Sequence, residues 1–153
     1  MGSHNKVLFC YLVAATALLI GATAETHTVG NDIGWNVPPG GSIAYRTWAD
    51  TRDFGIGDTV VFQWSNTHDV AQVSQTEYDN CAATNPIGGI HTTSPYNFTI
   101  NSTDPYYFMC SVSNHCSLGQ KVKIQVGAAA SSLTTSAYFT LILAMAIYFS
   151  NLM

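Results

Sequence analysis

A short stretch near the end of the chain, from Tyr106 to Gln120, constrains the fold more than any other feature. It begins with an apolar segment typical of a strand and continues as a polar loop. Four residues separate Cys110 from His115, and four more separate His115 from Gln120. This spacing lets a thiolate, an imidazole and a side-chain amide converge on one point. These donors are three of the four ligands of a type 1 copper site, so we expect a second histidine from elsewhere in the chain.

Three histidines are candidates for this second imidazole: His27, His68 and His91. His68 lies just past the alternating segment Asp58 to Trp64, where the end of a strand presents side chains at the rim of a barrel. His27 falls inside the first predicted strand, and His91 falls in a polar loop. We therefore predict His68 as the ligand and expect the other two to lie in the core or at the surface.

Three cysteines, Cys81, Cys110 and Cys116, follow the predicted leader, so one of them has no partner within the chain. A bond between Cys81 and Cys116 leaves Cys110 free to bind metal. Closing that long loop would stabilise the fold by roughly 4 kcal/mol on the chain-entropy model. A bond between Cys110 and Cys116 closes a small loop and removes the metal thiolate. The residues alone leave both pairings open, although the first is chemically more productive.

Short segments in which apolar and polar residues alternate predict a fold made of β-strands. The clearest is Asp58 to Trp64, which places Val60, Phe62 and Trp64 on one face. Other predicted strands are Glu25 to Val29, the segment around Phe98 and Ile100, Tyr106 to Cys110, and Lys121 to Val126. One short helical turn is predicted from Thr47 to Asp53. This pattern is typical of an antiparallel sandwich or barrel.

The first 24 residues have the features of a secretory signal peptide. Lys6 precedes the apolar run Val7 to Ile20, and Ala22-Thr23-Ala24 matches the small-residue pattern of a cleavage site. A transmembrane helix is the alternative, but the apolar run is too short for one. We therefore expect residues 1 to 24 to be removed, so that the mature chain begins at Glu25. The secretory route permits disulfides.

Residues 127 to 153 have the pattern of a GPI-attachment signal. Small residues and a polar spacer follow Gly127, and the apolar run Ala137 to Phe149 comes after them. A tail-anchored helix is the alternative, but the run is short and no basic residue follows it. We expect the lipid anchor on Gly127 or Ala128, which would place the protein on the outer face of the cell membrane.

The remaining segment, residues 25 to 126, is long enough for one domain with a real core. It holds nine acidic and four basic residues, so we expect no nucleic-acid partner. Asn97 and Asn101 each begin an N-glycosylation sequon on the outward face of a predicted strand. No nucleophile–base motif and no phosphate-binding glycine loop is present, so the chain is not expected to be an enzyme.

Several motifs, taken in chain order, resemble those of the phytocyanins, the plant family of cupredoxins. They are Gly34-Trp35, Tyr45 to Ala49, Phe54 to Asp58 with the strand that follows, His68-Asp69-Val70, Tyr78 with Cys81, and Tyr106 to Gln120. The match covers nearly all of residues 25 to 126, and the last motif is highly specific. The resemblance implies an all-β, cupredoxin-like Greek-key sandwich or barrel with short helical segments in its loops.

The resemblance also implies a ligand set and a disulfide. One type 1 copper ion would be bound by His68, Cys110 and His115, and Cys81 would be bonded to Cys116. Residue 120 separates the subtypes: methionine marks plantacyanins and uclacyanins, whereas Gln120 is similar to stellacyanins. Early nodulin-like members lack the ligands, but all four are present here.

These ligands predict an extracellular protein that carries single electrons, because a thiolate with two imidazoles suits both Cu(I) and Cu(II). We expect a monomer whose redox partner is a protein or a small molecule that the sequence does not identify. One alternative is a glycosylated, lipid-anchored interaction module in which copper redox is secondary. Another is a small copper or zinc enzyme, although a full set of four ligands leaves no open position for a substrate.

Overall fold

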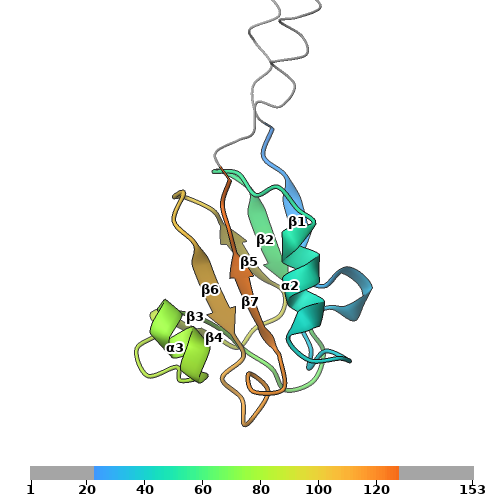
Figure 1. Ribbon diagram of the computed structural model, residues 1–153, viewed down its shortest axis with the longest axis vertical. Coiled ribbons are helices and arrows are strands. Elements are labelled where there is room, and N and C mark those ends of the chain that lie inside the picture. Colours follow the sequence, from blue (N-terminus) through green and yellow to red (C-terminus); the bar gives the residue numbers. More distant parts are fainter. Residues whose placement is uncertain (1–22, 128–153) are drawn as a thin grey trace, which may run out of the picture.

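The computed structural model describes residues 23 to 127, which form two packed β-sheets with short helices at their edges (Figure 1). The predicted signal peptide and attachment signal lie almost entirely outside the described residues. Among residues 23 to 127, none of the helices has the length and apolar character needed to cross a membrane.

The strands form one sheet of three and one of four. The first sheet has the order β1-β2-β5, with β1 at Thr26–Thr28, β2 at Thr59–Phe62 and β5 at Tyr96–Thr99. The second has the order β4-β3-β6-β7, with β4 at Ile87–His91, β3 at Val70–Val73, β6 at Tyr106–Met109 and β7 at Lys121–Ile124. The helices are η2 (Asn31–Ile33), α2 (Ile43–Asp50) and α3 (Gln75–Asn80). The predicted all-β sandwich is therefore confirmed.

One pairing differs from the antiparallel sheet that the sequence pattern predicts. β1 pairs with β2 in parallel, whereas the other strand pairs are antiparallel. The long connection that contains α2 lets the chain re-enter the sheet in the same direction, which a tight hairpin does not allow. Alternation of side chains indicates which face is buried but not the direction of the neighbouring strand. The parallel pairing of β1 with β2 could therefore not be predicted from the strand sequences.

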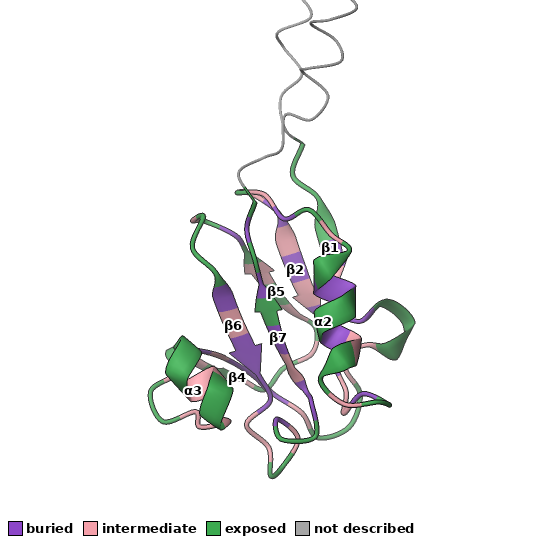
Figure 2. Cartoon of the chain, viewed as in Figure 1, coloured by how far each residue is buried: buried purple, intermediate pink, exposed green. Residues whose placement is uncertain are grey.

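The core lies between the sheets and is rich in aromatic rings. Phe62 is fully buried, and its ring centroid lies 5.0 Å from that of Trp35 and 4.9 Å from that of Phe108. Figure 2 shows buried residues along β6, whereas α3 is mostly exposed. Val60 and Phe62 are buried, as their predicted common face requires, but Trp64 lies beyond the end of β2 and is only partly buried.

The sequence analysis placed one helical turn at Thr47 to Asp53, and this was wrong in extent. Helix α2 begins at Ile43, and Tyr45, Trp48 and Ala49 form its buried face. Their i, i+3, i+4 spacing is typical of a helix, but the segment is too short for this periodicity to be recognised in the sequence. Helix α3 was missed, although Ser74 and Glu77 form a capping box at its start.

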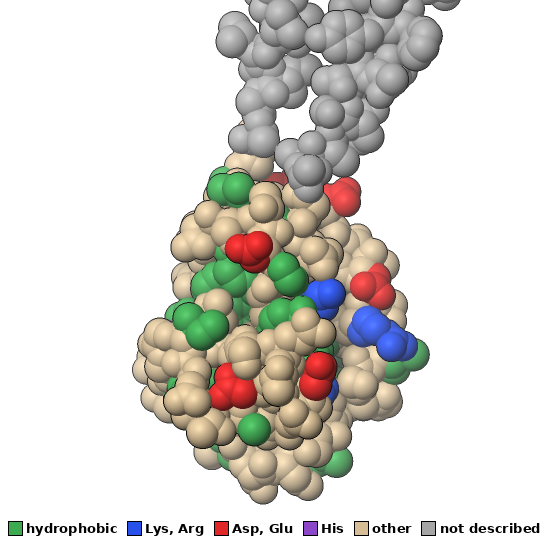
Figure 3. Space-filling model, turned by 60° about the vertical axis from the view of Figure 1, so that its left-hand side comes forward, with side chains coloured by type: hydrophobic (Ala, Val, Ile, Leu, Met, Phe, Trp, Pro, Cys, Tyr) green, Lys and Arg blue, Asp and Glu red, His purple; other side chains and the backbone are tan. Residues whose placement is uncertain are grey.

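The four basic side chains of residues 23 to 127 gather around one hollow beside α2 and β7. They are Arg46, Arg52, Lys121 and Lys123, and Asp50 and Asp53 line the same hollow. Figure 3 shows Lys and Arg side chains close together on one part of the surface, with acidic side chains interspersed. Lys121 lies over the ring of Tyr78, with its nitrogen 4.6 Å from the ring centroid. The absence of a nucleic-acid partner stays a prediction.

Candidate metal centre

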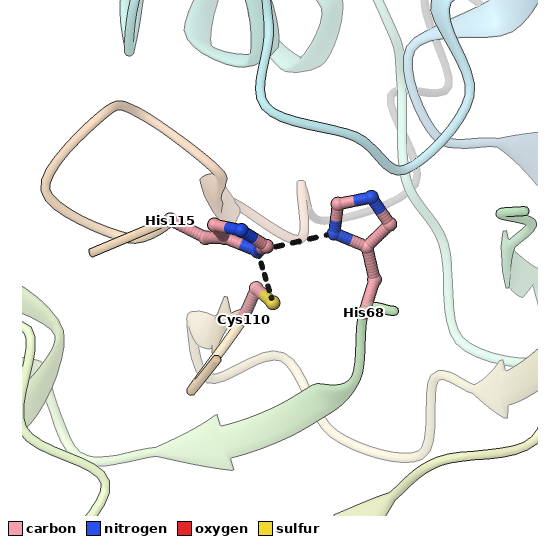
Figure 4. A group of neighbouring side chains, drawn as sticks. All are labelled: His68, Cys110 and His115. Carbon is pink, nitrogen blue, oxygen red and sulfur yellow. Dashed lines mark hydrogen bonds between the residues drawn. The ribbon is translucent and has the colours of Figure 1, made fainter. Parts of the chain in front are cut away.

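Three potential metal-binding side chains from two separate loops meet at one end of the sandwich. His68 lies in the loop before β3, and Cys110 and His115 lie in the loop between β6 and β7. Their potential ligand atoms all lie within 4.8 Å of one another. Nδ1 of His115 is 3.2 Å from Nδ1 of His68 and 3.4 Å from the sulfur of Cys110. Figure 4 shows both rings and the sulfur pointing toward one another.

The loop that carries two of these side chains, residues 110 to 120, is closed by its own backbone. The Cys110 N–H donates to the carbonyl of Gln120 at 3.0 Å, and the Gln120 N–H donates to the carbonyl of His115 at 2.9 Å. Because β6 and β7 are antiparallel neighbours, the sheet fixes both ends of the loop. Gly119 has a φ of +103°, and a Cβ there would clash with the backbone of Gly41 and Ser42. Only glycine therefore fits this turn.

Asp69, the neighbour of His68, connects the two loops that supply the metal-binding side chains. Its buried carboxylate accepts hydrogen bonds from the backbone N–H of Ser111 at 2.6 Å and from the Ser111 hydroxyl at 2.5 Å. Its carbonyl accepts from Nε1 of Trp35 at 2.7 Å. These contacts hold the loop before β3 against the residue that follows Cys110. The sequence analysis missed this role, because an acidic residue beside a histidine does not indicate its distant partner.

Gln120, at the end of the same loop, is fully buried. Its Nε2 donates to the carbonyl of Trp35 at 3.0 Å. Within the described part of the chain, its Oε1 is buried without a hydrogen-bond partner. A buried acceptor left unpaired costs about 1 to 3 kcal/mol. The lone pairs of this oxygen are therefore free to bind a metal ion, as an axial ligand requires.

The protonation of the cluster suits a soft metal ion. Burial lowers the pKa of His68, the charge of a protonated His115 lowers it further, and the Gln120 amide and Asp69 carboxylate offset this only in part. His68 is consequently neutral at neutral pH, with a lone pair free to bind metal. Burial also raises the pKa of the Cys110 thiol to about 11. Without metal, the thiol therefore keeps its proton at neutral pH.

We expect copper binding to release about one proton at neutral pH, because a metal thiolate forms only when Cys110 loses the proton that its raised pKa retains. The apparent affinity should then rise about tenfold per pH unit between about pH 7 and 9, where the free Cys110 thiol still carries its proton. Calorimetry in buffers of different ionisation enthalpy, with a competing chelator, measures both quantities. In Cys110→Ser the slope should disappear. An affinity independent of pH in the unaltered protein would contradict a protonated thiol.

The cysteine pairing that the residues alone left open is resolved by the structure. Cys81 and Cys116 form a disulfide, and Cys110 is a buried free cysteine. The alternative pairing of Cys110 with Cys116 is therefore wrong. Cys81 ends α3, so the bond attaches the residue next to His115 to the end of a helix that packs against β6. This attachment restrains His115 whether or not metal is bound.

The other predicted positions lie away from the metal-binding cluster. His27 is buried beside Asp58, with Nε2 3.0 Å from Oδ2. His91 stacks on Tyr96, with 3.8 Å between the ring centroids. Both sequon asparagines, at positions 97 and 101, are exposed, as attachment of a glycan requires. Neither histidine that the sequence analysis rejected as a ligand joins the cluster.

Known proteins share both the sequence and the fold of this domain. A family model described as a plastocyanin-like domain matches residues 35 to 120. Stellacyanin of Toxicodendron vernicifluum is 38% identical over 102 residues, which cover 65% of this chain and 94% of that protein. The blue copper protein of Arabidopsis thaliana is 38% identical over 129 residues, 84% of this chain; the match spans only 63% of that relative's length.

The solved structure of cucumber stellacyanin matches with a TM-score of 0.65 and 34% identity, over 71% of this chain and 99% of that one. The chain is a phytocyanin. The cucumber basic protein, a blue copper protein at 21% identity and a TM-score of 0.57, shares the fold. The donor set of this phytocyanin fits the family's metal, since a thiol and two imidazoles converge on one point. Its cofactor is one copper ion.

Proposed function

We propose that this phytocyanin carries single electrons outside the cell, with copper held by His68, Cys110, His115 and, as axial ligand, Gln120. Two observations carry the proposal: the buried Gln120 oxygen has no hydrogen-bond partner among the described residues, and the Gln120 amide lies close enough to His68 to affect its pKa. A structural glutamine would have both ends of its amide paired, as buried polar groups generally are. Here one end is fixed to Trp35 and the other is free.

The protein's part in such a reaction is to keep the ligands still. Bound copper supplies a one-electron couple between Cu(II) and Cu(I). The Asp69–Ser111 hydrogen bonds, the disulfide at Cys116 and the closed backbone of the loop restrain the side chains around it. Because the side chains are already gathered, little needs to move when the charge at the site changes. A low reorganisation requirement favours rapid electron transfer over catalysis on a bound substrate.

The exposure of the four side chains indicates where electrons would enter and leave. Cys110 and Gln120 are buried, whereas the rings of His68 and His115 are only partly buried. The imidazole edges are therefore the part of the ligand set nearest to a redox partner. Figure 1 shows both ends of the described chain leaving at the end opposite the loop between β6 and β7. A lipid anchor attached after β7 would leave the metal end facing away from the membrane.

The visible and EPR spectra of the copper-loaded domain test the proposal. We expect an intense blue charge-transfer band from the thiolate and a reversible one-electron couple. Rapid exchange of electrons with small redox proteins supports the carrier function. Steady consumption of dioxygen by the purified domain would instead indicate an oxidase, and a colourless cupric protein would contradict the copper site itself.

The cell-surface location requires its own test, because the segments that predict it lie outside the described residues. We expect the protein, expressed in plant cells, to be released from membranes by a phospholipase specific for phosphatidylinositol. Replacing the residues after Gly127 with a stop codon should send the same protein into the medium. Retention on membranes after phospholipase treatment would support the tail-anchored alternative. Digestion with an N-glycosidase reports whether Asn97 or Asn101 carries a glycan.

A further inference from the structure

The buried carboxylate of Asp58 lies at the other end of the molecule, away from the metal centre. Its side chain is 7% exposed. Oδ1 accepts from the backbone nitrogen of Glu25 at 2.8 Å, and Oδ2 accepts from the backbone nitrogen of Gly55 at 2.8 Å. Nε2 of His27 lies 3.0 Å from Oδ2. One carboxylate thus contacts the start of the domain, the first strand and the turn before β2.

The backbone of Glu25 is fixed on both sides. Its nitrogen donates to Asp58, and its carbonyl accepts from the N–H of Thr59 at 2.8 Å. Parallel pairing of β1 with β2 begins immediately afterwards, with Thr26 opposite Thr59. Ala24 and Thr23 are exposed. The folded sheet therefore needs the chain from Glu25 onward, and a cut before this residue would leave every strand pair of the two sheets intact.

The cleavage pattern of the predicted signal peptide ends at this point, since Ala22-Thr23-Ala24 directly precedes Glu25. Hydrolysis of the Ala24–Glu25 bond consumes one water, gives Ala24 a carboxyl group and leaves an amine on Glu25. An α-amine of ordinary pKa, about 7.7 to 8.0, is mostly protonated at neutral pH. We propose that Asp58 is the binding site for this new N-terminal ammonium, so that processing converts a hydrogen bond between an amide and the carboxylate into an ion pair.

The charges around Asp58 favour this pairing. Burial opposes ionisation, but the N–H groups of Glu25 and Gly55 and the ring of His27 outweigh it and hold the pKa of Asp58 below its usual value. The carboxylate is therefore ionised before any ammonium forms. His27 lies at Oδ2 and the chain start at Oδ1, so the ammonium does not displace the imidazole. The hydrogen bond from Glu25 already has an ionised acceptor, so the ammonium adds the attraction between opposite charges to it.

The inference rests on the proposed secretion, but its test does not depend on it. The domain is made with a removable tag so that one protein starts at Glu25 and a second starts at Thr23. Residues 23 to 127 contain both sheets and the core. The match to the solved structure of cucumber stellacyanin covers 99% of that chain, so a domain of this extent is expected to fold on its own. The Thr23 form keeps the Glu25 N–H but moves the ammonium away from Asp58.

At pH 7 we expect the Glu25 form to melt roughly 4 to 8 °C higher than the Thr23 form. The pKa of its α-amine, followed by NMR, should lie above the ordinary value, because an adjacent carboxylate favours the charged form. A pKa raised by folding gives stability that is complete below about pH 7.7 and disappears as the pH rises through the raised value. The difference between the two forms should therefore vanish in alkaline solution.

Three controls separate the ion pair from other causes. Asp58→Asn should melt at the same temperature in both forms. Acetylation of the Glu25 amine, which leaves Asp58 unaltered, should lower the melting temperature to that of the Thr23 form. Glu25→Ala keeps the ammonium and prevents cyclisation of an N-terminal glutamate, so it should retain the full gain.

Equal melting temperatures of the two starting forms, or an α-amine of ordinary pKa, would overturn the ion pair. Mass spectrometry of the protein secreted by plant cells examines the natural N-terminus separately. A start at another residue, or a cyclised Glu25, would show that the cell does not make this ammonium. Neither result would alter the copper spectrum, so the electron-carrier proposal is judged independently.

Discussion

Replacing Cys110 by serine is expected to abolish the blue colour of the copper-loaded protein completely. The intense absorption of a type 1 site comes from charge transfer between a thiolate and Cu(II), and Cys110 is the free cysteine among the described residues. Serine is nearly the same size, so the buried site should stay folded. Visible absorption and EPR after cupric loading measure the effect, and a melting curve of the copper-free protein confirms that the variant is folded.

A matched control removes the other two cysteines. Cys81→Ala combined with Cys116→Ala breaks the disulfide but keeps the Cys110 thiol. We expect this variant to stay blue and to lose about 2 to 4 kcal/mol of stability toward denaturant. If instead Cys110→Ser kept the blue band, or the disulfide variant lost it while folded, the metal thiolate would be assigned to the wrong cysteine.

Replacing Gln120 by methionine is expected to raise the reduction potential of the bound copper. An amide oxygen is a harder donor than a thioether and favours Cu(II), so its removal should favour Cu(I). Methionine has a similar length and suits a buried site. We expect a rise of more than about 59 mV, which corresponds to a tenfold change in the relative affinity for the two oxidation states. A spectroelectrochemical titration measures the potential.

Gln125→Met is the matched control, because this glutamine lies on an exposed position after β7, away from the cluster. Its potential should equal that of the unaltered protein. A Gln120→Met variant whose potential is unchanged or lower would show that the amide is not an axial ligand. The unpaired Oε1 would then need another explanation, such as a bound water.

Most of the metal centre was predicted from the types and spacing of residues within short segments of the sequence. The spacing of Cys110, His115 and Gln120 limits them to one loop, and a loop between neighbouring strands brings its residues together whatever the rest of the fold. The position of His68 directly after a clear strand was enough to prefer it over His27 and His91. Alternation along the strands was enough to predict an antiparallel sandwich or barrel, although not the parallel pairing of β1. The inferences about the strands and about the cluster of His68, Cys110 and His115 agree with the structure because each depends on residues close together in the sequence.

The contacts that support the site could not be predicted in the same way. Asp69 meets Ser111, and Gln120 meets Trp35, across separations of 42 and 85 residues. The parallel pairing of β1 and the position of Glu25 against Asp58 likewise depend on how distant segments pack.

The sequence by itself determined the kind of metal and the strands that carry its ligands, because ligand chemistry and side-chain alternation depend on residues that are close together in the sequence. Only the tertiary structure decided which cysteine stays free, which oxygen is left unpaired and which carboxylate receives the start of the domain. Each of these depends on which groups become buried side by side, and burial brings together residues that no local pattern connects.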